Sequence, residues 1–201
     1  MVTAPTAPSM QDVWNEALAV VPMLHTPVKP AGQQKALIIG TAAVPAAILA
    51  LRYPGFASVV TWTDALPQGL SADKRVRQVS SLDDLPPAET FDFVAIAESR
   101  LADEVLQTVR QHTTASSVIV IAVPQPTLVR PIMDVLRRTW RVVQPYREHT
   151  PDPAYFLLVG DQPFKRARPC PGFTKRLTDK YIPALFTFAK DEYAMISGSA
   201  P

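Results

Sequence analysis

Two apolar segments of this chain end in residues that could do chemistry. The first, 36–39, leads into Gly40 and then the run Thr-Ala-Ala-Val-Pro (41–45). A strand that enters a helix through a glycine-rich turn lets the backbone approach a nucleotide closely, because glycine has no Cβ. This chain keeps one glycine and follows it with side chains and a proline ring. We therefore expect residues 41–45 to block the approach above Gly40.

Carboxylates follow two of the apolar segments. Asp64 comes two residues after the segment 58–62, and Glu98 follows the segment 91–97. Carboxylates at strand ends can hold sugar hydroxyls or accept a proton. Successive strand residues point to opposite faces, so Asp64 reaches the face used by Thr63 only if the strand has already ended. Otherwise Asp64 is a loop acid or a helix cap, and Glu98 is a solvated loop residue or a charge at a helix start.

Other catalytic and metal-binding patterns are missing from the sequence. His25, His112 and His149 lie far apart and lack the spacing of zinc ligands, so no metal site is predicted. There is no nucleophile elbow for a hydrolase and no Gly-x-x-x-x-Gly-Lys loop for phosphates. The single cysteine, Cys170, cannot form an internal disulfide, which favours a reducing, cytoplasmic location.

Composition is typical of globular proteins and argues against nucleic-acid binding and against a membrane span. Of the 201 residues, 47% are hydrophobic and 19% are charged, and the net charge of +2 is too small to predict nucleic-acid binding. The basic run within 165–176 is expected to be a solvated face, with contact to an acidic partner as the alternative. No stretch reaches the roughly 18 apolar residues that span a bilayer. Residues 1–10 lack the pattern of a secretory signal and are expected to form a flexible arm.

Hydrophobic periodicity predicts strands that alternate with helices. Helices are expected over 12–21, 44–51, 101–111 and 127–140, and strands over 36–39, 58–62, 76–79, 91–97, 117–123, 141–144 and 155–159. Pro22 and the prolines of 27–30 are expected to end the first helix. The alternation favours an α/β fold with a mostly parallel sheet, and the last two strands, with no long helix between them, suggest an antiparallel addition.

The segments and their order resemble the polyamine aminopropyltransferases, the family of spermidine synthase. Residues 12–18, followed by Val21-Pro22, are similar to the family's helix with a Tyr-x-Glu-Met-Leu pattern and a later Val-Pro. Residues 91–96 are similar to the strand that delivers the family's catalytic aspartate. The other similar segments, in unbroken order, are 36–40, 51–54, 58–60, 127–146, 155–159 and the tail 174–191. The likeness covers about 11–191, through degenerate motifs.

The resemblance implies a Rossmann-like, seven-stranded methyltransferase-type sheet, mostly parallel with an antiparallel closing strand. It implies that residues 11–164 form this domain and that 165–201 form a C-terminal docking tail that is part of it. Only ten residues precede Gln11, so we expect the family's small N-terminal β domain to be absent. That domain contributes to the family's oligomer and substrate lid, which puts both features in question.

The family's cofactor and catalytic positions are mostly altered. Its Gly-Gly-Gly-Asp-Gly loop falls on 40–44, where only Gly40 matches, with Thr41 next to it. The acid that would hold the ribose falls on Thr63, one residue before Asp64. The catalytic aspartate falls on Ala97, and a second acid falls on Arg100. Glu98 could serve as the base only if its loop is shifted in register.

The substrate positions are altered too. Glu16 matches a family acid that faces the polyamine, but taken alone it is expected to be a surface or capping residue. Trp14 stands where a tyrosine would contact substrate, and we expect it to pack into the core. The family's aromatic-Gly-Phe falls on 154–156, which places Tyr155 at the central position.

These losses together predict a catalytically degenerate protein that binds no cofactor and acts as a non-catalytic interaction subunit or scaffold. A protein partner or an oligomer would contact the N-terminal arm, the segment 165–176 or the tail 181–188. Two alternatives stay open. One is an active transferase of aminopropyl or methyl groups that uses S-adenosylmethionine or its decarboxylated form in a site rebuilt around Asp64 and Glu98. The other is a sensor of nucleosides or polyamines.

Overall fold

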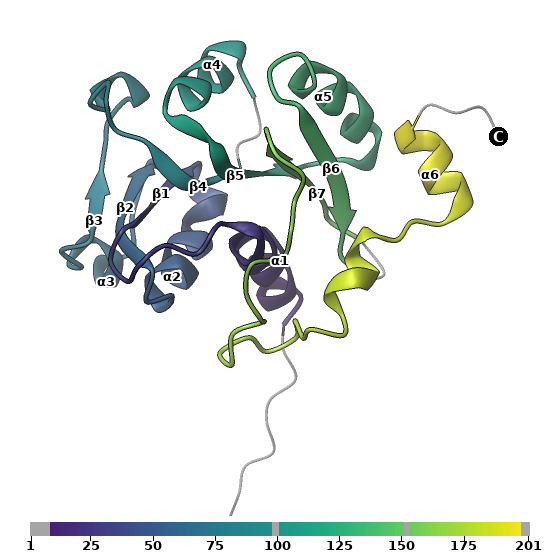
Figure 1. Cartoon of the computed structure of the whole chain (residues 1–201), viewed down its shortest axis with the longest axis horizontal. Helices are drawn as coiled ribbons and strands as arrows, with labels where there is room; N and C mark the ends of the chain where they lie inside the picture. The colour runs from purple at the N-terminus through teal and green to yellow at the C-terminus, as the bar shows by residue number, and fades with distance from the viewer. Residues whose placement is uncertain (1–8, 98–100, 151–152, 198–201) are drawn as a thin grey trace, which may run out of the picture.

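The computed structural model describes residues 9–97, 101–150 and 153–197, and its centre is a seven-stranded sheet (Figure 1). The strands are β1 (Gln34–Ile39), β2 (Phe56–Trp62), β3 (Val76–Gln78), β4 (Phe91–Ile96), β5 (Thr113–Val123), β6 (Val142–Arg147) and β7 (Tyr155–Gly160). The helices are α1 (Met10–His25), α2 (Val44–Arg52), α3 (Gln68–Ser71), α4 (Asp103–Gln111), α5 (Val129–Leu136) and α6 (Lys190–Ser197). Short 3-10 turns are η1 (Thr41–Ala43), η2 (Leu82–Asp84), η3 (Pro126–Leu128) and η4 (Ile182–Phe186).

The strands lie in the order β3-β2-β1-β4-β5-β7-β6. The first five pair in parallel, whereas β7 runs antiparallel between β5 and β6. This arrangement confirms the predicted fold class, a mostly parallel methyltransferase-type sheet with an antiparallel closing strand. The connections account for this pattern, because α2 lies between β1 and β2 and α4 lies between β4 and β5, whereas the described residues between β6 and β7 contain no helix.

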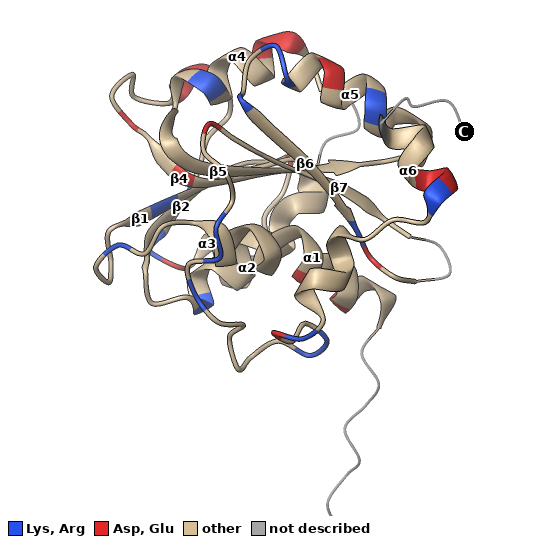
Figure 2. Ribbon diagram, turned by 45° about the vertical axis from the view of Figure 1, so that its right-hand side comes forward, with Lys and Arg blue, Asp and Glu red and all other residues tan. Residues whose placement is uncertain are grey.

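Helices cover both faces of the sheet and create two apolar layers (Figure 2). One layer lies between the sheet and α1 and α2, and the other lies between the sheet and α4 and α5. Within β1, Ile38 belongs to the first layer, while Leu37 and Ile39 belong to the second. A parallel strand buried on both sides needs apolar residues at every position, which is why these strands appear as continuous Val, Ile and Leu runs.

Helix α1 extends past the predicted stop at Pro22, and that expectation was wrong. The helix continues to His25, and its end is closed by Thr26, whose N–H donates to the Pro22 carbonyl at 3.1 Å. A proline inside a helix costs about 3 kcal/mol. Met23 and Leu24 beyond it are fully buried, and burial of two such side chains stabilises the helix by about 4 kcal/mol, which outweighs that cost.

Strand β6 is longer than predicted, and helix α5 is shorter. The strand runs through Pro145 because β6 is the edge of the sheet, where a missing N–H removes no ladder hydrogen bond. Helix α5 ends at Leu136, and the chain after it forms turn bonds such as Thr139 N–H to the Leu136 carbonyl. The turn carries Trp140 back into the second layer, where it is buried.

The C-terminal tail crosses the outer side of the first layer before it reaches α6 (Figure 1). The Ala167 N–H donates to the Leu24 carbonyl at 2.7 Å. Leu177, Ile182 and Leu185 are buried in the same cluster as α1. The apolar residues of this segment therefore pack on their own domain. Within the described part of the chain, no helix combines the length and apolar character needed to cross a membrane.

Candidate nucleotide-type crevice

The carboxyl ends of β1, β2 and β4 meet at one edge of the sheet. The order of the strands reverses direction between β1 and β4, since β2 and β3 lie on one side and β5 on the other. In open α/β sheets this is where the loops diverge and leave a crevice. The candidate site lies at this edge.

Gly40 has a conformational reason to be glycine. Its φ is 92°, in the left-handed region that side-chain-bearing residues avoid. Its N–H donates to the Trp62 carbonyl of β2 at 3.0 Å, and its carbonyl accepts from the Ala43 N–H at 3.0 Å. The chain can therefore turn sharply from β1 into η1 while it stays bonded to β2.

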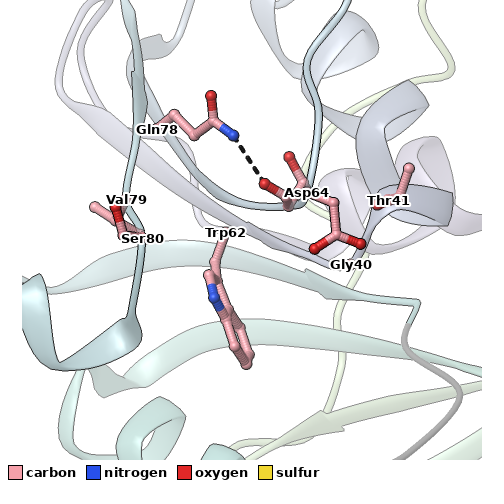
Figure 3. A pocket seen from close by; sticks show the side chains of 8 residues that line it. Gly40, Thr41, Trp62, Asp64, Gln78, Val79 and Ser80 are labelled. Atoms are coloured by element: carbon pink, nitrogen blue, oxygen red, sulfur yellow. Dashed lines mark hydrogen bonds between the residues drawn. The ribbon is translucent and has the colours of Figure 1, made fainter.

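The space above Gly40 is open, which corrects the expectation that residues 41–45 block it. A cavity of about 450 Å³ lies there (Figure 3). It is lined by Gly40, Thr41, Trp62, Thr63, Asp64, Gln78, Val79 and Ser80. The physical reason is the immediate start of η1, which turns Ala43 and Val44 into the α1–α2 layer, where both are buried. We call this space the first cavity.

Asp64 lines the first cavity because β2 has already ended at Trp62. Its carboxylate lies beside Gly40 and Thr41 (Figure 3). No hydrogen bond or ion pair joins it to another described residue. The neighbouring Thr63 is committed elsewhere, since its hydroxyl donates to the Ala65 carbonyl at 3.3 Å and its own carbonyl accepts from Gln78 Nε2 at 2.8 Å. The structure thus brings Gly40, Thr41, Thr63 and Asp64 together.

The end of β4 carries no proton acceptor at the position that the resemblance singles out. Ala97 stands there, and its N–H donates to the Ile39 carbonyl at 3.0 Å, which extends the pairing of β4 with β1. Its methyl group cannot accept a proton. Glu98 and Arg100 lie outside the described residues, so their predicted roles stay predictions.

Two further cavities continue along the same edge of the sheet. The second, of about 450 Å³, is lined by Trp14, Ala42, Ala97, Ala122, Val123, Pro124, Pro126, Pro153, Ala154 and Tyr155. The third, of about 590 Å³, is lined by Met10, Gln11, Trp14, Thr41, Ala42, Pro45, Glu148 and Ala154. Thr41 lines both the first and the third cavity, while Trp14 lines both the second and the third. The three therefore adjoin.

Trp14 and Tyr155 border these cavities. The Trp14 ring packs on Phe156 with centroids 5.9 Å apart, so part of it joins the core as predicted while the rest faces cavity space. The Tyr155 hydroxyl donates to Glu192 Oε1 of α6 at 2.9 Å. Burial, together with Glu192, raises the pKa of Tyr155. This hydroxyl is engaged within the protein.

Glu16 is neither a surface nor a capping residue, so that expectation was wrong. It is 5% exposed, and its carboxylate accepts backbone N–H groups of three consecutive residues, Lys175, Arg176 and Leu177. The distances from Glu16 Oε2 to the last two nitrogens are 3.0 and 2.9 Å. Glu16 anchors the tail to α1, and it lines none of the three cavities.

Sequence reasoning missed Glu148. This residue follows β6, is 2% exposed and lines the third cavity. Burial raises its pKa from 4.5 to about 7. A strand that continues past Pro145 would have placed Tyr146 and Glu148 on one face, two residues apart. The expected strand end at residue 144 hid that signal.

The comparisons with known proteins agree with this fold. No family model matches the chain, and no curated protein matches it. Among solved structures, spermidine synthase from Thermotoga maritima is 14% identical with a TM-score of 0.74, covering 92% of this chain and 74% of the other. A spermidine synthase in complex with the transition state analogue AdoDATO is 15% identical with the same TM-score and coverage.

A more distant structure shares the architecture. Human methyltransferase-like protein 13, in complex with SAH, is 10% identical with a TM-score of 0.60, covering 92% of this chain and 90% of the other. At identities this low the likeness shows the fold alone. The chain therefore has a Rossmann-like, methyltransferase-type fold, with an open crevice at the edge of the sheet described above.

Proposed function

We propose that this chain binds an adenosyl ligand, S-adenosylmethionine or its decarboxylated form, in the first cavity. The observation that carries the proposal is the unpaired Asp64 carboxylate beside Gly40, in an open space at the carboxyl ends of β1 and β2. A carboxylate accepts hydrogen bonds from two vicinal hydroxyls, which is what a ribose presents. The fold shared with S-adenosylmethionine-type transferases supports the same conclusion.

The cavity also has room and partners for a base. Trp62 offers an aromatic ring and Val79 an apolar side chain, while Ser80 adds a hydroxyl. With its ribose at Asp64, the ligand would extend past Thr41, a residue that lines both the first and the third cavity.

Calorimetric titration with S-adenosylmethionine, its decarboxylated form and methylthioadenosine tests the proposal. We expect micromolar dissociation constants. The Asp64→Asn variant should bind each ligand about tenfold more weakly, because it loses charge-assisted hydrogen bonds to the ribose. The matched control is Asp134→Asn, which changes an exposed acid on α5. Absence of binding by all three ligands would contradict the proposal.

Loss of aminopropyl transfer is a second proposal, supported by a different observation. The position of the family's base holds Ala97, and Glu16 is occupied by the tail. A protein that keeps the ligand but lacks both carboxylates would act as a non-catalytic interaction subunit or a sensor, as the resemblance suggests. No product should form from decarboxylated S-adenosylmethionine and a polyamine. Product formation above the uncatalysed rate would favour an active transferase instead.

The partner required by an interaction subunit has its own test. The protein purified from its native source should elute with a partner chain or as an oligomer. A lone monomer that binds adenosyl ligands would favour the sensor. A lone monomer that binds none would remove support from every version of this function.

A further inference from the structure

A fourth cavity lies at the amino ends of the central strands, at the opposite edge of the sheet from the first cavity. It is lined by His25 at the end of α1, by residues 115–118 near the start of β5 and by residues 162–167 after β7. Its volume is about 230 Å³. Pockets for drug-sized molecules measure roughly 300–1,000 Å³, so this one suits a small ligand.

Most of the wall of the fourth cavity is apolar. The side chains that make it so include Pro27, Val118, Pro163 and Phe164. Phe164 also belongs to the rim of the first apolar layer, which holds its ring in place. A ligand in this cavity would therefore bury apolar surface, which favours a molecule with a hydrocarbon part.

His25 brings an imidazole ring without hydrogen-bond partners to this cavity. Both ring nitrogens are buried, and neither has a partner among the described residues. The rings of Phe164 and Phe186 pack against it at steep angles, with centroids 6.1 and 6.2 Å away. Burial lowers the pKa of His25, the Lys165 backbone opposes this shift, and the charge of Arg166 adds to it. A buried polar group that makes no hydrogen bond is costly, so a ligand that bonds to the ring would be stabilising.

The charges that line the fourth cavity are positive. Lys165 is exposed and makes no hydrogen bond or ion pair with another described residue. Arg166 also lines the cavity, although its guanidinium group pairs with Asp179. No aspartate or glutamate is among the described lining residues, and the adjacent Asp161 is paired with Arg110 at 2.5 Å. The cavity therefore favours an anionic group.

We propose that the fourth cavity binds a small organic carboxylate. The hydrocarbon part of the ligand lies against Pro163 and Phe164, while its carboxylate accepts hydrogen bonds from the His25 ring and from the Lys165 ammonium group. This site is separate from the proposed adenosyl site, because the first and fourth cavities share no lining residue.

Other classes of ligand fit the fourth cavity less well. A cation would face Lys165 and Arg166 with no described acid in the lining to balance it. A purely apolar molecule would leave the His25 nitrogens without partners. An inorganic anion such as phosphate would leave the apolar wall without contacts. A metal ion lacks ligands, since the described residues hold no group of three His, Cys, Asp or Glu suited to one.

The first experiment titrates benzoate into the protein and follows the ring C–H signals of the histidines by NMR. The His25 signals, assigned with the His25→Gln variant, should move and saturate. Benzyl alcohol and benzylamine keep the aromatic ring but replace the carboxylate with a neutral or a cationic group. Both should bind at least tenfold more weakly than benzoate. Inorganic phosphate, which has the charge without the hydrocarbon part, should also bind at least tenfold more weakly.

The second experiment tests the two groups that hold the carboxylate. Lys165→Met keeps the length of the side chain and removes its charge, so benzoate should bind about threefold more weakly, the modest effect of an exposed ion pair. Binding of benzyl alcohol to this variant should be unchanged. His25→Gln should weaken benzoate binding by about tenfold. The matched control is Lys74→Met, an exposed lysine before β3 at the other end of the sheet, which should change neither affinity.

Several results would overturn this inference. Benzyl alcohol that binds as tightly as benzoate would remove the role of the charge, and phosphate that binds as tightly would show a site for simple anions. The absence of a saturable shift at His25 would exclude the site altogether. So would unchanged benzoate affinity in both His25→Gln and Lys165→Met. Binding of methylthioadenosine should be the same with and without saturating benzoate, so failure of the adenosyl site leaves the carboxylate site standing.

Discussion

Glu16 and Glu148 are two carboxyl groups buried near α1, at 5% and 2% exposure, yet their surroundings differ. The Glu16 carboxylate accepts three backbone N–H groups of the tail. Oε1 of Glu148 has no partner among the described residues, and the side chain borders a cavity. The Glu16 carboxylate therefore finds its hydrogen-bond donors within the protein. Glu148 leaves a buried carboxyl oxygen without a hydrogen-bond partner among these residues, and this contrast separates a carboxylate that the fold stabilises from one whose ionised form is costly.

Replacing Glu16 should have the largest effect. Glu16→Ala leaves three backbone N–H groups of the tail without acceptors, two of them only partly buried. We expect a loss of about 3 kcal/mol in the free energy of unfolding. Urea denaturation of the variant measures it. A loss below about 1 kcal/mol would mean that water replaces the carboxylate and that Glu16 does not anchor the tail.

Glu148→Gln should change stability in the opposite direction and only at neutral to high pH. The pKa of Glu148 rises from 4.5 to about 7 on folding. Between these values the folded state holds a proton that the unfolded state has lost, so the wild type loses stability as pH rises through this window. Above pH 7 the loss is complete, at about 2 kcal/mol once solvent screening is allowed for.

The measurement compares urea denaturation of the wild type and Glu148→Gln at pH 5 and pH 8. The variant should be the more stable protein at pH 8, and the two should differ less at pH 5. An unchanged difference at the two pH values would show that Glu148 does not titrate in this window. The contrast with Glu16 would then rest on hydrogen bonding alone.

Gly40→Ala should have a smaller effect on stability and a clear one on binding. An alanine at a φ of 92° is strained by about 1 to 2 kcal/mol. Relief of that strain would move η1 and its neighbour Thr41 at the edge of the first cavity. We expect weaker binding of methylthioadenosine by calorimetry. Unchanged affinity in a folded variant would show that the turn at Gly40 does not contribute to ligand binding.

Asp134→Asn should have the smallest effect, and it sets the baseline for the other variants. Asp134 lies on α5, half exposed, with nitrogen atoms of Arg130 and Arg137 both 3.8 Å from its carboxylate. Exposed pairs of this kind contribute about 0.5 kcal/mol or less. Denaturation curves at low and high salt should nearly coincide with the wild type. A larger change would make this acid unsuitable as a control.

The local sequence pattern did not indicate whether either glutamate would have hydrogen-bond partners. Glu16 is bonded to residues about 160 positions away in the chain, and no helical periodicity within α1 indicates which tail residues will pass it. Glu148 follows an edge strand that tolerates Pro145, whereas proline in a central strand would have ended it. The sequence analysis therefore placed one of these acids on the surface and overlooked the other.

The site at β1 and β2 was partly predictable. The spacing of the apolar segments placed Gly40, Thr63 and Asp64 at one edge of the sheet, because parallel strands have their carboxyl ends together. The expected strand 58–62 also gave the end of β2 at Trp62, but it left open whether Asp64 would line the cavity, which the structure shows. The expected blockage by 41–45 failed because η1 directs Ala43 and Val44 into the core.

The mostly parallel sheet between two helix layers was within reach of the sequence alone, because continuous apolar runs that alternate with amphipathic segments bury their surface well in that arrangement. The openness of the crevice and the partners of each buried carboxyl group were settled by packing between distant segments. Hydrogen bonds to Glu16 and the turn after Gly40 each depend on where a second piece of backbone lies, which no local sequence pattern records.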